Sequence, residues 1–286
     1  MPTTIPTTTS LTRPGSPSAG DAYFETDTKN YIIYDGANWR AYIDDGAIVS
    51  SLTNSFSGSF DGSGDWIDCN PLTAYQGATQ LSMSFWWKPN SPGVGPVIGS
   101  RNSSSDQWGF LTSAGTNYVI IETGNSSEIA TYTVPNDTNF HHYLLSYNAG
   151  SITLYIDGDL ESSLSGTADP VLHSQSADFE IGRFSSSFYA NGLFDEVALW
   201  DTNLDTSNVN QIYNLGSIID LSTDAGDYNQ SSNLTHWWRI GDHASDTSSG
   251  GGAVAAGNVI GNVENAANPG TNDGTGTAAT YSSTTP

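Results

Sequence analysis

Residues 81–87 alternate with a period of two, and this pattern constrains the fold more than any other feature of the chain. Leu81, Met83, Phe85 and Trp87 would lie on one face of an extended strand, because successive side chains point to opposite sides. Such a large apolar face has to be covered. The sequence therefore predicts a strand that packs on a hydrophobic core.

Further strand-like runs follow, separated by short turns rich in Gly, Asn, Ser and Asp. They lie at 118–121, 129–134, 143–147, 152–156 and 194–200. The turn sequence at 148–151 would join two of these runs as a hairpin. Many short strands at this spacing predict an all-β fold, a sandwich or jelly roll of two packed antiparallel sheets.

One segment has the period of a helix instead. Val209, Ile212 and Tyr213 would share one helical face, Asp205 is suited to the N-cap, and Gly216 is suited to the position after the last helical residue. The sequence therefore predicts one short helix beside the strands.

The first 46 residues differ from the rest of the chain. Residues 1–20 carry four prolines among threonines and serines, which disfavours a helix and favours an extended arm. Aromatic runs at 22–26, 31–34 and 39–43 predict a small β meander that is too small to be stable alone. We therefore expect residues 1–46 to form an appendage for anchoring or oligomerisation, and residues 47–286 to form the main domain.

The charge balance excludes several functions. The chain has 30 acidic and 7 basic residues and a formal net charge of −23. Nucleic acids and anionic lipid surfaces attract clustered Lys and Arg, so we expect no nucleic-acid or membrane partner. The sequence shows no membrane-spanning apolar run and no secretory signal. If the protein works outside a cell, we expect it to leave by another route, such as lysis.

Several segments, in order, resemble the laminin G-like family, which has the concanavalin A-like jelly roll. They are 59–67, 82–89, 140–158, 179–183, 191–197 and 211–214. In many relatives a Trp-rich strand and an Asn-Asp-Gly-Thr turn precede the Phe-Asp-Gly strand. Here the corresponding 234–242 and 272–276 come last. The resemblance therefore implies a permuted chain in which residues 230–286 complete the sandwich.

The N-terminal segments 13–17, 20–26 and 34–39 resemble a short module of tailed-bacteriophage tail fibres and other virion proteins. In that family the module attaches or oligomerises appendages. The resemblance implies a protein of the virion surface, whose residues 1–46 contact other virion proteins and form a homo-oligomer, with a trimer favoured.

Three hypotheses follow for the function. The first is a non-enzymatic structural protein of the virion, either a capsid decoration or part of a tail fibre or neck appendage. The alternative is a receptor-binding lectin that recognises host-surface polysaccharide. A polysaccharide hydrolase is the third and least favoured, because fold alone does not set function.

The sequence argues against a hydrolase. Glycosidases on this sandwich carry Glu-x-Asp-x-x-Glu along one strand, so that alternate carboxylates share the cleft face. Asp178 and Glu180 are two residues apart, but no third acid follows them. Asp195 and Glu196 are adjacent and would point to opposite faces. We therefore predict that the protein is not an enzyme.

A saccharide site would need aromatic rings beside amide and carboxylate groups. The candidates on expected loops are Trp108 with Asn102, Asp106 and Gln107, and Phe188 and Tyr189 with Asn191. The alternative interpretation of Trp108 is a core residue. The tryptophans in strand-like runs belong to a core more often than to a binding site.

The resemblance also implies a calcium ion at the rim of the sandwich, although no cofactor is required. The acids in matching segments are Asp61, Asp65, Asp68, Asp195 and Glu196. The first three do not fit the spacing of an EF-hand loop. Solvated turn acids are the favoured alternative in so acidic a chain.

Overall fold

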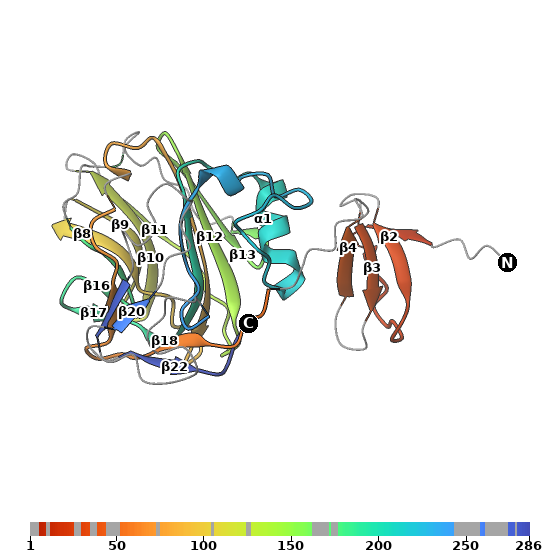
Figure 1. The fold of residues 1–286 in the computed structure, drawn as a ribbon, viewed down its shortest axis with the longest axis horizontal. Coiled ribbons are helices and arrows are strands. Elements are labelled where there is room, and N and C mark those ends of the chain that lie inside the picture. The colour runs from red at the N-terminus through yellow and green to blue at the C-terminus, as the bar shows by residue number, and fades with distance from the viewer. Residues whose placement is uncertain are drawn as a thin grey trace.

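A computed structural model of the protein shows a small N-terminal sheet followed by a main domain of two packed sheets (Figure 1). The structure describes residues 6–9, 12–25, 30–34, 39–43, 52–72, 75–103, 106–123, 127–161, 172, 177–242, 258–260, 274–277 and 279–286. The main domain is an antiparallel jelly-roll sandwich with one short α-helix in its described part, as the sequence predicts.

The N-terminal sheet has the strand order β1-β2-β3-β4. Its strands are β1 (Thr7–Thr8), β2 (Ala22–Glu25), β3 (Asn30–Tyr34) and β4 (Trp39–Ile43). The last three form the predicted antiparallel meander, and β1 adds to β2 in parallel. Ile32 is fully buried, and the ring of Trp39 lies 5.6 Å from Tyr23 and 5.4 Å from Tyr34.

The arm before β2 is tied to this sheet. Arg13 pairs with the buried Glu25, and the Phe24 N–H donates to the carbonyl of Pro6 at 2.9 Å. These contacts hold Pro6 and Arg13 of the arm against the meander.

The inner sheet lies between the outer sheet and helix α1 (Figure 1). Its strand order is β14-β13-β12-β7-β18-β5-β22, and β19 pairs with β18 beside this path. The strands are β5 (Ser57–Asp61), β7 (Gln80–Pro89), β12 (His141–Asn148), β13 (Ser151–Ile156), β14 (Asp159–Glu161), β18 (Asn191–Trp200), β19 (Leu234–Trp238) and β22 (Thr280–Ser282).

The outer sheet has the order β11-β10-β9-β8-β15-β6-β21-β20. Its strands are β6 (Trp66–Asp68), β8 (Ile98–Ser103), β9 (Asp106–Ser113), β10 (Thr116–Thr123), β11 (Ser127–Thr131), β15 (Phe179–Ile181), β20 (Asn258–Ile260) and β21 (Gly274–Thr277). A short hairpin of β16 (Arg183–Phe184) and β17 (Phe188–Tyr189) follows β15.

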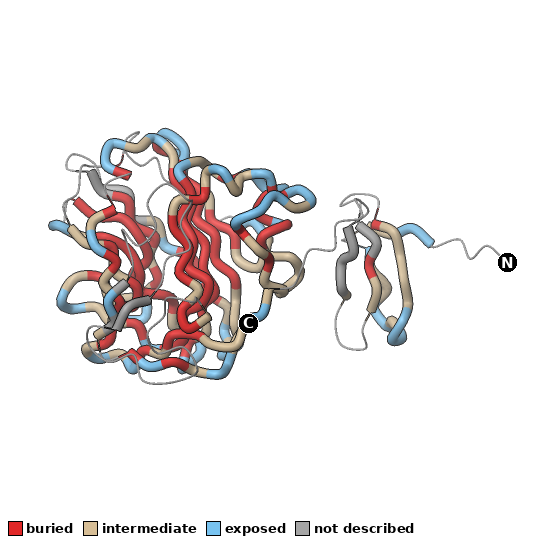
Figure 2. The backbone as a smooth tube through the Cα atoms, viewed as in Figure 1, coloured by how far each residue is buried: buried red, intermediate tan, exposed pale blue. Residues whose placement is uncertain are grey.

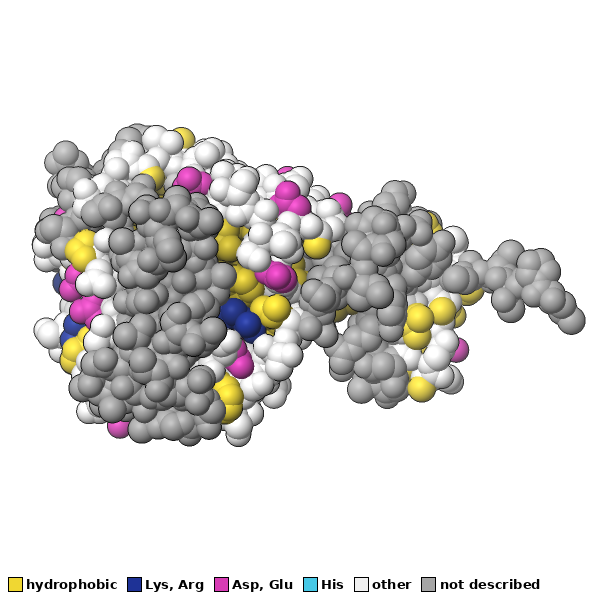
Figure 3. Space-filling model, viewed as in Figure 1, with side chains coloured by type: hydrophobic (Ala, Val, Ile, Leu, Met, Phe, Trp, Pro, Cys, Tyr) yellow, Lys and Arg dark blue, Asp and Glu magenta, His cyan; other side chains and the backbone are white. Residues whose placement is uncertain are grey.

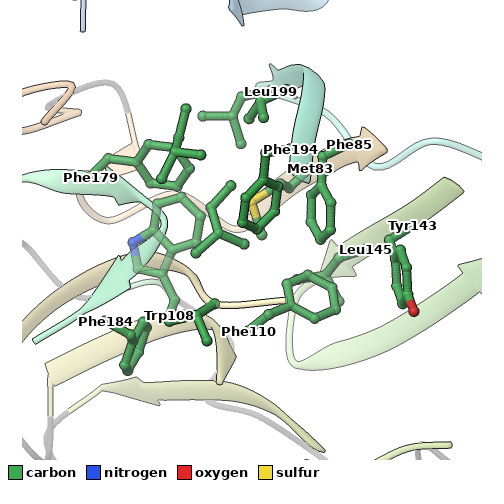
Figure 4. Packing of buried hydrophobic residues seen from close by; sticks show 14 of the residues in the cluster. Met83, Phe85, Trp108, Phe110, Tyr143, Leu145, Phe179, Phe184, Phe194 and Leu199 are labelled. Atoms are coloured by element: carbon green, nitrogen blue, oxygen red, sulfur yellow. The ribbon is translucent and has the colours of Figure 1, made fainter. Parts of the chain in front are cut away.

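The strands of the two sheets are largely buried (Figure 2), and aromatic rings fill the core between them (Figure 4). The ring of Phe85, from the alternating segment of β7, stacks on Tyr143 at 5.5 Å. It also meets Phe110 edge-on at 5.1 Å and Phe194 at 5.4 Å. The predicted inward face of β7 is therefore the centre of the core.

Helix α1 (Thr206–Tyr213) and the loop segments around it cover the other side of the inner sheet. Asp205 caps the helix, since its Oδ1 accepts from the backbone N–H of Asn208 at 3.0 Å. The helix ends at Asn214, which takes a left-handed conformation, and not at the predicted Gly216. The residues of β7 that point away from the core, such as Trp86, are therefore buried by this layer.

The end of the chain lies within both sheets. β21 pairs with β6 in the outer sheet, and β22 pairs with β5 in the inner sheet. Ser57 Oγ donates to the carbonyl of Thr284 at 2.8 Å, and Trp237 and Trp238 are fully buried. Within the described ranges, no helix is long and apolar enough to cross a bilayer.

Candidate functional site

The outward surface of the outer sheet carries a group of aromatic and charged side chains. Ile67 of β6 is fully buried in the core, so its neighbours Trp66 and Asp68 point outward. Glu180 of β15 lies directly opposite Asp68 in the antiparallel pair. Period two thus places an aromatic ring and two carboxylates on one surface.

Arg183, at the start of the β16–β17 hairpin, connects these groups. Its guanidinium carbon lies 3.7 Å from the centre of the Trp66 ring. Its Nε donates to Glu180 Oε2 at 2.8 Å, and its Nη2 donates to the other carboxylate oxygen. The ring of Tyr189, on the second hairpin strand, lies 6.4 Å from that of Trp66. We call Trp66, Asp68, Glu180, Arg183 and Tyr189 the Trp66 surface.

The charges on the Trp66 surface influence one another. The hydrogen bond to Glu180 raises the pKa of Arg183, so this guanidinium keeps its charge. Burial raises the pKa of nearby Asp178, and the charges of Asp68 and Glu180 raise it further. Flat rings beside fixed charged hydrogen-bonding groups can pack on the apolar face of a sugar and bind its hydroxyls.

The sequence predicts part of this surface. Tyr189 and Asp68 belong to it, although the sequence predicts Asp68 as a calcium ligand. Phe188 packs partly against the core, and exposed Asn191 accepts from Asn90 Nδ2 at 2.7 Å. Trp66 and Arg183 are not among the predicted site residues, and Glu180 is considered there only as a hydrolase acid. The apolar Ile67 between Trp66 and Asp68 is the sequence signal for Trp66, because in a strand Ile67 would point inward and its two neighbours outward.

The prediction that Trp108 lies on an exposed loop is wrong. Trp108 is on β9, is 4% exposed and stacks on Phe179 with ring centroids 5.3 Å apart (Figure 4). Asp106 and Gln107 on the same strand are buried, while exposed Asn102 donates to Asp106 Oδ2 at 3.0 Å. The alternative interpretation, that Trp108 is a core residue, fits this position.

The five calcium candidates are not brought together. Asp65 Oδ2 accepts from the backbone of Asp61 in the turn after β5, whereas Asp68 faces outward on β6. Asp195 and Glu196 are buried on the inner sheet. Among the described residues, no three His, Cys, Asp or Glu side chains are arranged to hold a metal ion. A single calcium site built from all five acids is therefore inconsistent with the fold.

A serine–histidine pair under the helix layer has no catalytic geometry. Ser84 Oγ lies 2.9 Å from His142 Nε2, as in a nucleophile–base pair. However, His142 Nδ1 is buried with no hydrogen-bond partner, so no carboxylate orients the ring. Burial lowers the pKa of His142 to about 4, and both side chains are shielded from solvent. The neighbouring His141 binds Asp137 instead, Nε2 to Oδ1 at 3.0 Å.

These features define a lectin-like β-sandwich. A laminin G-like model described as the concanavalin A-like lectin/glucanases superfamily matches residues 61–210, more than half of the chain. The chain therefore belongs to this superfamily. Comparison with curated protein sequences gives no match.

Solved structures that resemble this chain come from distant proteins. A proposed carbohydrate-binding protein from Bacteroides ovatus has 15% identity and a TM-score of 0.50, over 93% of this chain and 70% of the other. A heptameric SAP-like pentraxin from Limulus polyphemus has 15% identity and a TM-score of 0.42, over 56% and 82%. Tailspike protein 2 of bacteriophage CBA120 has 12% identity and a TM-score of 0.42, over 69% and 34%. At these identities the likeness concerns the fold alone.

Proposed function

We propose that the protein is a non-enzymatic attachment protein of a tailed-bacteriophage particle, and that its jelly roll binds host-surface saccharide through the Trp66 surface. The observation that carries saccharide binding is the position of Trp66 and Tyr189 beside the Arg183–Glu180 pair. Of the three hypotheses, this arrangement favours the receptor-binding lectin. The virion location rests on the resemblance of residues 1–46 to tail-fibre modules.

The absence of a hydrolase triad in the sequence supports the non-enzymatic part of the proposal. On the Trp66 surface, Glu180 already accepts two hydrogen bonds from Arg183. A carboxylate paired in this way is poorly suited to donate a proton to a glycosidic oxygen. Sustained release of reducing sugar from host polysaccharide would contradict this part.

Replacing Trp66 with alanine should weaken binding of the wild type's best glycan-array ligand by about tenfold or more, because the sugar loses its aromatic surface. Tyr189→Ala should have a smaller effect in the same direction. Isothermal titration with that saccharide measures both changes. Leu160→Ala is a matched control, since Leu160 is 61% exposed on β14 of the other sheet. If the wild type binds no glycan on the array, saccharide binding is contradicted, and the hypothesis of a structural decoration protein remains.

Attachment through residues 1–46 agrees with the distribution of charge. Residues 47–286 carry 24 of the 30 acids and four of the seven basic residues, and acidic side chains lie at several separate places on the described surface in Figure 3. Copies of the main domain therefore repel each other. The N-terminal module carries the other three basic residues and a small charge of −3. Contacts between copies are therefore expected at the module, and weak saccharide sites would gain avidity from the assembly.

The full chain should sediment as a trimer, and a chain that lacks residues 1–46 should sediment as a folded monomer. Analytical ultracentrifugation at low and high salt measures both masses, and circular dichroism confirms the fold of the shortened chain. A full-length monomer at micromolar concentration, or a trimer that survives removal of residues 1–46, would contradict this role of the module.

A further inference from the structure

A small cavity lies between the inner sheet and the helix layer. Its volume is about 10 Å³ for the centre of a water molecule. Helix α1 and the loop after it line one side with the apolar side chains of Ile212, Ile218, Ile219 and Leu221. The inner sheet lines the other side with Ser84, Trp86, His142 and Glu196, none of which is more than 5% exposed. The polar groups of this cavity therefore all come from the sheet.

His142 brings an unpartnered polar atom to this cavity. The residue is 1% exposed, and its Nε2 lies 2.9 Å from Ser84 Oγ. Its other ring nitrogen, Nδ1, is buried and has no hydrogen-bond partner among the described residues. Such a nitrogen is unfavourable in a protein interior, because it has lost its hydrogen bonds to solvent. The imidazole therefore indicates a hydrogen-bonding ligand in the adjoining cavity.

Glu196 faces the cavity because β18 has a bulge at this point. The backbone φ of Glu196 is 49°, and the register of β18 with β7 shifts after Asp195. Phe194 and Val197 both belong to the core, so the strand has one residue too many for strict alternation. The bulge brings Glu196 to the helix side of the sheet, where it lines the cavity. Asp195 lies on the same side, opposite Trp86, so the expectation that the two acids point to opposite faces is wrong.

The carboxylate of Glu196 can accept a further hydrogen bond. Its Oε1 accepts from Arg239 Nε at 3.1 Å, and its Oε2 accepts from Trp237 Nε1 at 2.6 Å. Each carboxylate oxygen has two lone pairs, so these two bonds leave acceptor positions unused. Because His142 Nδ1 has no partner, the imidazole and the carboxylate do not bind each other directly, although both line the cavity.

We propose that this cavity is the binding site of one water molecule, which accepts a hydrogen bond from His142 Nδ1 and donates one to the carboxylate of Glu196. A cavity of about 10–15 Å³ on this measure is large enough for a water molecule if at least two polar groups bind it. A dry cavity of this size is typical of purely apolar walls, and His142 and Glu196 make one wall of this cavity polar.

The donors and acceptors around the ring determine its tautomer. Burial lowers the pKa of His142 to about 4, so the imidazole is uncharged and has one N–H group and one acceptor nitrogen. Ser84 Oγ makes no other hydrogen bond among the described residues, so its O–H donates to Nε2. Nδ1 then carries the hydrogen and donates it to the water. Every contact from Ser84 through His142 and the water to Glu196 thus pairs one donor with one acceptor.

The water links β7, β12 and β18 beneath the helix and fixes the ring on which the helix end packs. Tyr213, the last residue of α1, stacks on the ring of His142 with centroids 6.1 Å apart, and the ring of Trp86 lies 5.1 Å from it on the sheet. The site therefore positions the end of helix α1. It lies on the inner sheet, whereas the Trp66 surface is on the outer sheet, so its test is independent of saccharide binding.

A crystal structure of the full-length protein at about 1.5 Å resolution tests the site directly. One density peak should lie about 2.6–3.2 Å from both His142 Nδ1 and a carboxylate oxygen of Glu196. A cavity without density would overturn the proposal. A direct bond between Nδ1 and Glu196, or a peak at the distance of a metal ligand, about 2.0–2.5 Å, would overturn it as well.

Oxygen-17 magnetic relaxation dispersion tests the site in solution, because it counts the water molecules that stay bound while the protein rotates. His142→Leu removes Nδ1 and should lower this count by about one relative to the wild type. Ser84→Ala is the matched control, since it removes the partner of the other ring nitrogen and should keep the water. An unchanged count in His142→Leu, or the same loss in Ser84→Ala, would overturn the proposal. If His142→Leu does not fold, the density peak in the wild type decides.

Discussion

A chain truncated after residue 229 is expected to give insoluble protein with no cooperative unfolding transition. The deletion removes β19, β20, β21 and β22 and with them the fully buried Trp237 and Trp238. Loss of one buried tryptophan side chain costs about 3–5 kcal/mol. Two such losses approach the whole stability of a typical domain, about 5–15 kcal/mol. Solubility, near-ultraviolet circular dichroism and thermal melting measure the outcome.

Removing only Thr285 and Pro286 is the matched control for this truncation. These residues follow Thr284, whose carbonyl accepts from Ser57 Oγ, and they belong to no strand. The short deletion should melt within a few degrees of the wild type. A soluble, cooperatively melting protein without residues 230–286 would show that the sandwich is complete without its C-terminal strands.

Replacing Trp108 with alanine should lower the free energy of unfolding by about 3–5 kcal/mol and leave saccharide affinity unchanged where the variant remains folded. The reason is its position between the sheets, against Phe179 and 6.1 Å from the ring of Tyr75. Urea unfolding followed by tryptophan fluorescence gives the first quantity, and titration with the saccharide gives the second.

The comparison of Trp108 with Trp66 makes this prediction specific. Trp66→Ala should change stability by less than about 1.5 kcal/mol, because its ring is partly exposed and packs on a guanidinium. Trp108→Ala should thus lower stability and leave saccharide affinity unchanged, whereas Trp66→Ala should lower saccharide affinity with little change in stability. A stable Trp108→Ala protein with weakened saccharide binding would restore Trp108 as a site residue.

The strands and hairpins could be predicted because local geometry determines them. Leu81, Met83, Phe85 and Trp87 alternate in sequence and face the core as predicted. The turn at 148–151 joins β12 to β13, and its central residues Ala149 and Gly150 both have positive φ, which suits a two-residue hairpin. Asp205 caps the helix because a short polar side chain can reach the first free N–H groups.

The site could be predicted only in part, because it depends on contacts between distant segments. The Trp66 surface joins β6 to a hairpin more than a hundred residues later, and no local pattern gives that pairing. The sequence predicts a loop at Trp108, whereas the structure places it within β9. Gly109 lies directly opposite Gly99 of β8, where an added Cβ would meet backbone atoms. Both glycines therefore serve strand packing and mark no turn.

The pairing of β22 with β5 places Thr284 within hydrogen-bonding distance of Ser57, the first residue of β5. A fluorophore, affinity tag or fused enzyme added after Pro286 would therefore emerge close to the start of β5. Such a label would report on this edge of the inner sheet. A cysteine placed at exposed Leu160 of β14 offers a handle for surface immobilisation, since the native Cys69 is fully buried and would not compete for the reagent.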